Sequence, residues 1–109
     1  MTPHHYVLDE KGIPVIEPDL MKWAMWFEHA RESRIVARTK MGDAEVSTVF
    51  LGLDHNWSHV GPPVLWETMI FGGEHDQEQL RCTGSREQAE ALHASMVKRL
   101  KPPKLKVKR

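Results

Sequence analysis

The sequence predicts a compact α+β domain, a mainly antiparallel sheet of four or more strands with two helices packed on one face. Four strand-like segments follow one another at residues 34–40, 45–53, 64–71 and 78–83. Helical patterns lie before and after this run, at residues 18–31 and from residue 85 onward. The 109 residues fit one domain, which we place at residues 1–100, followed by a basic C-terminal tail at residues 101–109.

A short hairpin and a helix are expected near the N-terminus. Residues 5–8 and 13–16 flank a turn that ends in Gly12, where a positive φ is easily met. The helix at residues 18–31 begins with proline, which suits a first turn. One apolar face of this helix is expected to be core and consists of Leu20, Trp23, Ala24, Phe27 and Ala30. The apolar surface is widened by Met21, Met25 and Trp26, either as more core or, around Met25 and Trp26, as a partner-binding face.

The two central strands are apolar on both faces. In residues 45–53 the two sides are Val46, Thr48 and Phe50 against Val49, Leu51 and Leu53. A strand of this kind must be covered on both faces. Because both helices are expected on one side, the second face must be covered by the hairpin, another copy of the chain or a partner, and we favour a homodimer.

The last helix is expected to begin at a capping box, Ser85-Arg86-Glu87-Gln88, in which the serine hydroxyl and the glutamine side chain satisfy free backbone amides. Its apolar face contains Ala89, Leu92, Met96 and Leu100, and His93 falls on the same face. Pro102 and Pro103 end the helix.

The formal net charge of zero hides an asymmetry along the chain. The last twelve residues contain seven basic residues and no acidic one, which leaves eight basic and fifteen acidic residues in positions 1–97. A basic tail of this kind attracts phosphate backbones through a salt-sensitive field. The tail is therefore interpreted either as solvated chain or as a nonspecific nucleic-acid contact.

Several function classes are disfavoured by missing motifs. Cys82 is the only cysteine, so neither an intramolecular disulfide nor a thiolate zinc site is expected. The sequence has no Gly-rich phosphate loop and no G-x-S-x-G elbow, which argues against nucleotide-dependent and serine-hydrolase mechanisms. It also has no apolar run of membrane-spanning length and no secretory signal pattern, so we expect a cytoplasmic protein without membrane contact.

Histidines and carboxylates gather around the two central strands. The set consists of Asp54, His55, His59, Glu67, His75, Asp76 and His93. Imidazole and carboxylate groups are the usual ligands of hydrolytic metal ions, which makes His55, His59 and His75 candidate metal ligands. A metal-dependent hydrolase or nuclease is therefore an alternative, although His55 and His59 lie in a proline-containing loop and lack helical metal-site spacing.

Glu67 and His93 are the two polar residues expected among apolar ones. Each falls on an apolar face of its own element, where an unpaired polar group is costly. We therefore expect them to pair beneath the sheet, either as a structural pair or as candidate catalytic acid/base groups.

Binding candidates come from the central loop and from the tail. Trp57 lies among the polar loop residues Asp54 and His55, and its ring either contacts a partner or folds back onto the domain. The tail candidates are Lys101, Lys104, Lys106, Lys108 and Arg109.

Four segments of the chain resemble a family of small uncharacterised proteins encoded by tailed bacteriophages and prophages. They are VARTKMG (36–42), VSTVFLGLDH (46–55), GPPVLWETMIFGG (61–73) and the EALH segment (90–93), within a resemblance over residues 6–97. The resemblance implies a phage or prophage setting in the cytoplasm of a bacterial host. It supplies no activity, no cofactor and no catalytic residues. The leading hypothesis is thus a non-enzymatic phage accessory protein that binds a host or phage protein.

Overall fold

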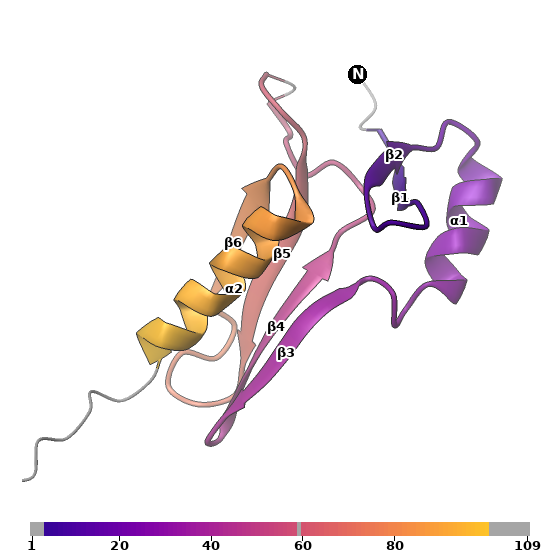
Figure 1. Ribbon diagram of the computed structural model, residues 1–109. Helices are drawn as coiled ribbons and strands as arrows, with labels where there is room; N and C mark the ends of the chain where they lie inside the picture. Colours follow the sequence, from indigo (N-terminus) through magenta and orange to yellow (C-terminus); the bar gives the residue numbers. More distant parts are fainter. Residues whose placement is uncertain (1–3, 59, 101–109) are drawn as a thin grey trace, which may run out of the picture.

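The computed structural model describes residues 4–58 and 60–100 (Figure 1). Within these residues the elements are β1 (Tyr6–Leu8), β2 (Pro14–Ile16), α1 (Leu20–His29), β3 (Ile35–Met41), β4 (Ala44–Phe50), β5 (Val64–Phe71), β6 (Gln79–Thr83) and α2 (Arg86–Leu100). The predicted α+β fold is confirmed.

Strands β3, β4, β5 and β6 form one antiparallel sheet in that order. Neighbouring strands are consecutive in the chain, so the sheet is a simple meander. The register of the central pair places Val46 opposite Ile70 and Thr48 opposite Thr68. Strands β1 and β2 form a separate two-stranded hairpin, as expected.

Helix α2 covers one face of the four-stranded sheet (Figure 1). Its hydroxyl cap is present, because Ser85 Oγ accepts a hydrogen bond from the Gln88 N–H at 3.3 Å. The helix residues buried on the sheet are Ala89, His93 and Met96. Facing them are alternate residues of β4 and β5, namely Val46, Thr48, Phe50, Trp66, Thr68 and Ile70, all fully buried.

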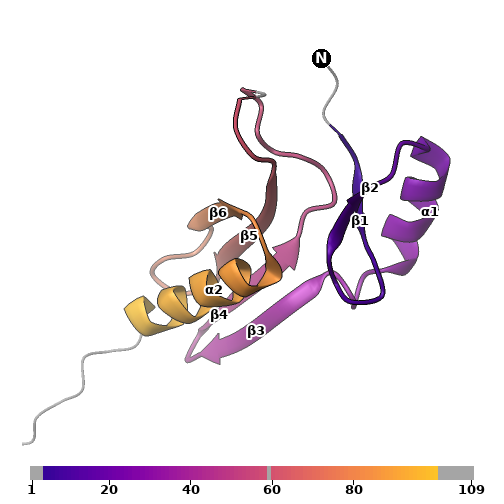
Figure 2. The ribbon, with the colours of Figure 1, turned by 45° about the horizontal axis from the view of Figure 1, so that its top comes forward.

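Helix α1 packs mainly on the hairpin and reaches the sheet at one end. In Figures 1 and 2 the hairpin lies between α1 and the sheet. The Asp19 carboxylate caps α1 by accepting hydrogen bonds from the Met21 and Lys22 amides. Trp26 meets Phe50 edge to face, with ring centroids 6.1 Å apart, on the same sheet face that α2 covers.

The expected core face of α1 is wrong in part. Residues Trp23, Trp26 and Phe27 turn inward, but Leu20 is 61% exposed and Ala24 is exposed as well. The reason is that the helix packs on a hairpin of two short strands, which covers only a narrow stripe of its surface.

The opposite face of the sheet has mixed polarity. Among the described residues no helix or strand packs on it. Half-buried Val49 and Met69 lie there beside an ion pair between Arg81 and Glu67 at 2.8 Å. The side chains of this face are therefore only partly covered by one another, and the expectation of a second copy on this face stays a prediction.

Candidate functional site

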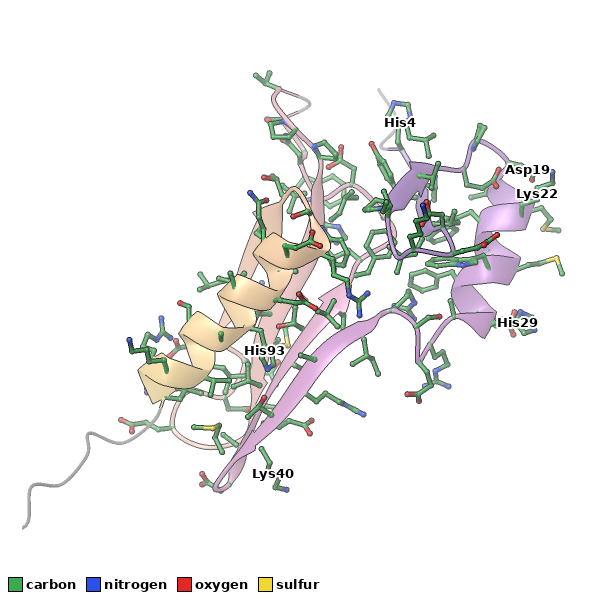
Figure 3. All side chains as sticks on the ribbon, in the orientation of Figure 1. His4, Asp19, Lys22, His29, Lys40 and His93 are labelled. Atoms are coloured by element: carbon green, nitrogen blue, oxygen red, sulfur yellow. The ribbon has the colours of Figure 1, made fainter. Side chains whose placement is uncertain are left out.

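His93 is the centre of a buried hydrogen-bond chain between α2 and the sheet. Its Nε2 lies 2.8 Å from Thr39 Oγ1, and its Nδ1 lies 2.7 Å from Thr48 Oγ1. Thr48 Oγ1 is in turn 2.6 Å from Thr68 Oγ1. In Figure 3 the labelled His93 points from the helix toward the strands. Three strands and one helix are thus tied together by one imidazole and three hydroxyl groups.

This chain of hydrogen bonds is enclosed. His93 is 6% exposed, and Thr48 and Thr68 are fully buried. Burial lowers the pKa of His93, which favours the neutral imidazole, with one ring nitrogen donating and the other accepting. An imidazole closed off from solvent in this way is suited to fixing the packing of α2 rather than to exchanging protons with a substrate.

The expected pair between Glu67 and His93 is wrong. The side chain of Glu67 lies on the opposite face of the sheet, where it accepts a hydrogen bond from Arg81 Nε at 2.8 Å. Residues on β5 alternate between the two faces, and Trp66 and Thr68 face α2. The position of Glu67 between them directs its carboxylate away from His93.

His75 belongs to a third, exposed cluster. Its Nδ1 lies 2.6 Å from Glu78 Oε2, and the other carboxylate oxygen of Glu78 accepts a hydrogen bond from Arg99 Nη2 at 2.7 Å. The hydrogen bond from His75 lowers the pKa of Glu78, with further lowering from the charges of His75 and Arg99. The cluster connects the β5–β6 turn to the end of α2.

The loop between β4 and β5 is ordered by its own polar side chains. Asp54 Oδ1 accepts hydrogen bonds from the amides of Asn56 at 2.7 Å and Val64 at 2.9 Å. The Asn56 side-chain amide donates to the carbonyl oxygens of Val60 and Pro62. Asp54 is therefore occupied in holding the two ends of the loop together.

The same loop presents apolar side chains to solvent. Trp57 is 57% exposed, with its ring centroid 5.2 Å from that of His55. His55 Nδ1 lies 2.7 Å from the Leu53 carbonyl oxygen, so this ring nitrogen donates. The ring of Trp57 is therefore not buried in the domain, and its contact with a partner stays a prediction.

The candidate metal ligands are held in separate places. Within residues 4–58 and 60–100 no three histidine, cysteine or acidic side chains gather as a metal site would require. His55 and His75 lie in different loops, each bound to a local partner. His59 and the tail candidates Lys101, Lys104, Lys106, Lys108 and Arg109 lie outside the described residues.

A larger set of exposed apolar side chains lies on the N-terminal unit. We call it the β2–α1 surface, and it consists of Ile13, Val15, Ile16, Leu20, Met21 and Met25, each at least 44% exposed. These residues occupy β2, its flanking turn and the first turns of α1, which belong to one N-terminal unit in Figures 1 and 2, where α1 packs against β1. The sequence predicts a partner-binding face only around Met25 and Trp26, and Trp26 in fact turns inward. Helical periodicity does not tell how much of a helix its neighbours cover.

Comparison with known proteins gives no relative from which a role can be carried over. The chain matches no protein-family model, no curated protein and no solved structure. In the part of the chain that the structure describes, neither helix has the length and apolar character needed to cross a bilayer.

Proposed function

We propose that this chain is a non-enzymatic accessory protein of a tailed phage or prophage, and that it acts by binding a host or phage protein through the β2–α1 surface. The observation that supports this proposal is the placement of exposed apolar residues. Of the ten exposed large hydrophobic residues in the described part of the chain, six lie between Ile13 and Met25. A concentration of this kind on a small domain is typical of a protein-contact surface.

The chemistry of the surface suits a protein partner. Fully burying an exposed aliphatic or methionine side chain contributes about 1.5–3 kcal/mol. The six residues are 44–72% exposed, so burying each contributes a part of this free energy to docking. Met21 and Met25 are unbranched and adapt their shape to the surface they meet. Lys22 and His29 lie on the outer side of the same helix and provide polar groups near the apolar ones (Figure 3).

The separation of the histidines and carboxylates favours a binding protein over a metal-dependent hydrolase. Glu67, His75 and His93 each have a local partner, and these partners belong to different faces or loops. A metal-assisted hydrolase requires several such groups around one water molecule. The phage setting follows from the sequence resemblance alone.

The proposal is tested by reversing the apolar character of the helix. Met21→Glu with Met25→Glu adds two charges at side chains that are 72% and 59% exposed, so stability should change by less than about 1 kcal/mol. Lys22→Glu, on the exposed side of the same helix, is the matched control. Host lysate with and without phage proteins is passed over each immobilised protein, and the retained proteins are quantified by mass spectrometry. Each retained protein is then purified, and its Kd for the three proteins is measured by titration.

We expect one partner to bind the parent and the Lys22→Glu protein, and to bind the double variant at least about tenfold more weakly. Equal retention by all three proteins would place the contact elsewhere. The predicted homodimer is tested by sedimentation equilibrium of the parent and the double variant. A stable dimer formed equally by both proteins would locate self-association on the open face of the sheet.

A further inference from the structure

A shallow hollow with a strongly basic lining lies where α1 passes into β3. It has a volume of about 460 Å³ and is lined by Arg31, Glu32, Arg34, Ile35, Arg38 and Val49. Sites for small molecules usually have volumes of about 300–1,000 Å³. The hollow shares no residue with the β2–α1 surface.

The charges of this hollow are poorly compensated within the chain. Three arginines and one glutamate give the lining a net charge of plus two at neutral pH. Arg38 Nε is 4.0 Å from Glu45 Oε1, at the limit of an ion pair. Within residues 4–58 and 60–100, no carboxylate lies within salt-bridge distance of Arg31 or Arg34.

Arg34 is positioned by stacking and not by hydrogen bonds. Its guanidinium carbon lies 3.7 Å from the centre of the Phe27 ring, an arrangement that fixes the plane of the group. Its Nε is buried without an acceptor among the described residues. Its backbone is fixed as well, because the Arg34 carbonyl oxygen accepts a hydrogen bond from the Phe50 amide at 2.8 Å. A buried N–H without an acceptor is uncommon in proteins and calls for an explanation.

Burial and the charge of Arg31 both lower the pKa of Arg34, burial being the larger cause. Like charges that face each other without a carboxylate destabilise a folded protein unless an anion joins them. A ligand with several oxygen atoms would relieve this repulsion and would give the guanidinium groups their acceptors.

We propose that Arg31, Arg34 and Arg38 form a binding site for the phosphate group of a small organic phosphate, with Ile35 and Val49 contacting its less polar portion. Planar guanidinium groups bind phosphate oxygens in pairs, and their geometry suits phosphate better than a single point charge does. Glu32, which also lines the hollow, accepts a hydrogen bond from a ligand hydroxyl group. This site goes beyond the proposed protein contact and does not depend on it.

Adenosine 5′-monophosphate is the probe, compared with adenosine and with inorganic phosphate at constant ionic strength. The full chain is titrated while amide and arginine Nε signals are followed by NMR, which separates this hollow from the basic tail. We expect saturable shifts at residues 31–38 and 49–50 with the nucleotide, weaker ones with phosphate and none with adenosine. Arg31→Gln and Arg38→Gln, both at exposed positions, should each raise the Kd about tenfold.

Arg99→Gln is the control, because it removes the same charge from the end of α2. An equal loss of affinity in this variant would show a general charge effect and overturn the proposal. Absence of saturation at about 10 mM nucleotide would do so too, since that is weaker than specific small-molecule binding. A third contrary outcome is tight binding of single-stranded DNA at the same residues without binding of the mononucleotide, which would assign the arginines to nucleic acid.

Discussion

The burial of His93 makes the free energy of unfolding sensitive to pH. Burial lowers the pKa of this imidazole below its ordinary value of 6.5. Below pH 6.5 the unfolded chain therefore takes up a proton at His93 while the folded chain does not, and acid favours unfolding. Above that pH both states are neutral at this residue, and the contribution of His93 is complete.

We expect the free energy of unfolding to fall as the pH decreases from about 7 to about 5.5, and to fall less steeply in His93→Gln, whose amide bonds to hydroxyl groups but does not titrate. Urea unfolding at several pH values measures the difference between the two slopes. The pKa of Glu78 is lowered from 4.5, so protonation of this carboxylate affects the free energy of unfolding only below the range of pH 7 to 5.5. Identical slopes in the two proteins would mean that His93 titrates alike in the folded and unfolded states.

At the scale of elements, the attachment of α1 depends on close approach at Gly52. This glycine has a φ of +76°, and a Cβ placed on it would lie 2.9 Å from Cε1 of Phe27. The Gly52 carbonyl oxygen accepts hydrogen bonds from the Trp23 indole N–H and the Tyr6 amide. Gly52, two residues after the end of β4, thus holds both the hairpin and the helix.

Gly52→Ala is expected to destabilise the fold by about 2–4 kcal/mol, from the strained φ together with the contact with Phe27. Gly42→Ala is the matched control, because Gly42 has a φ of +63° but nothing within 4 Å of a Cβ. The free energy of unfolding of Gly42→Ala should fall only by the cost of a positive φ at alanine, about 1–2 kcal/mol. Equal losses in the two variants, measured by urea unfolding, would show that Phe27 moves aside without cost.

Most of the element pattern was predictable from the sequence, whereas the partners of the polar residues were not. Strand positions such as β5, expected at 64–71 and found at Val64–Phe71, follow from apolar runs between glycine and proline turns. The partner of His93 depends on how α2 lies across the sheet, and Thr39 and Thr48 are 54 and 45 residues away from it in sequence. The periodicity of the sequence shows on which face of a helix or strand a residue lies. It does not show which residue of another element contacts it.

At the scale of the whole molecule, the two helices are held by very different amounts of packing. Helix α2 buries Ala89, His93 and Met96 and contacts all four strands of the sheet. Helix α1 has no fully buried residue, and it packs mainly on β1, with Trp26 reaching Phe50 of β4. The hairpin and α1 are therefore expected to open without unfolding of the sheet.

Native-state hydrogen exchange measures this difference directly. Amides of α1 should exchange through openings that cost less free energy than global unfolding, while amides of β4, β5 and α2 should exchange only through global unfolding. The low cost of opening suits a docking surface, because Met21 and Met25 then adjust to a partner together with their backbone. Protection of α1 equal to that of α2 would show a single cooperative unit, in which the packing of Tyr6, Leu8 and Trp26 against the core couples the hairpin and helix to the sheet.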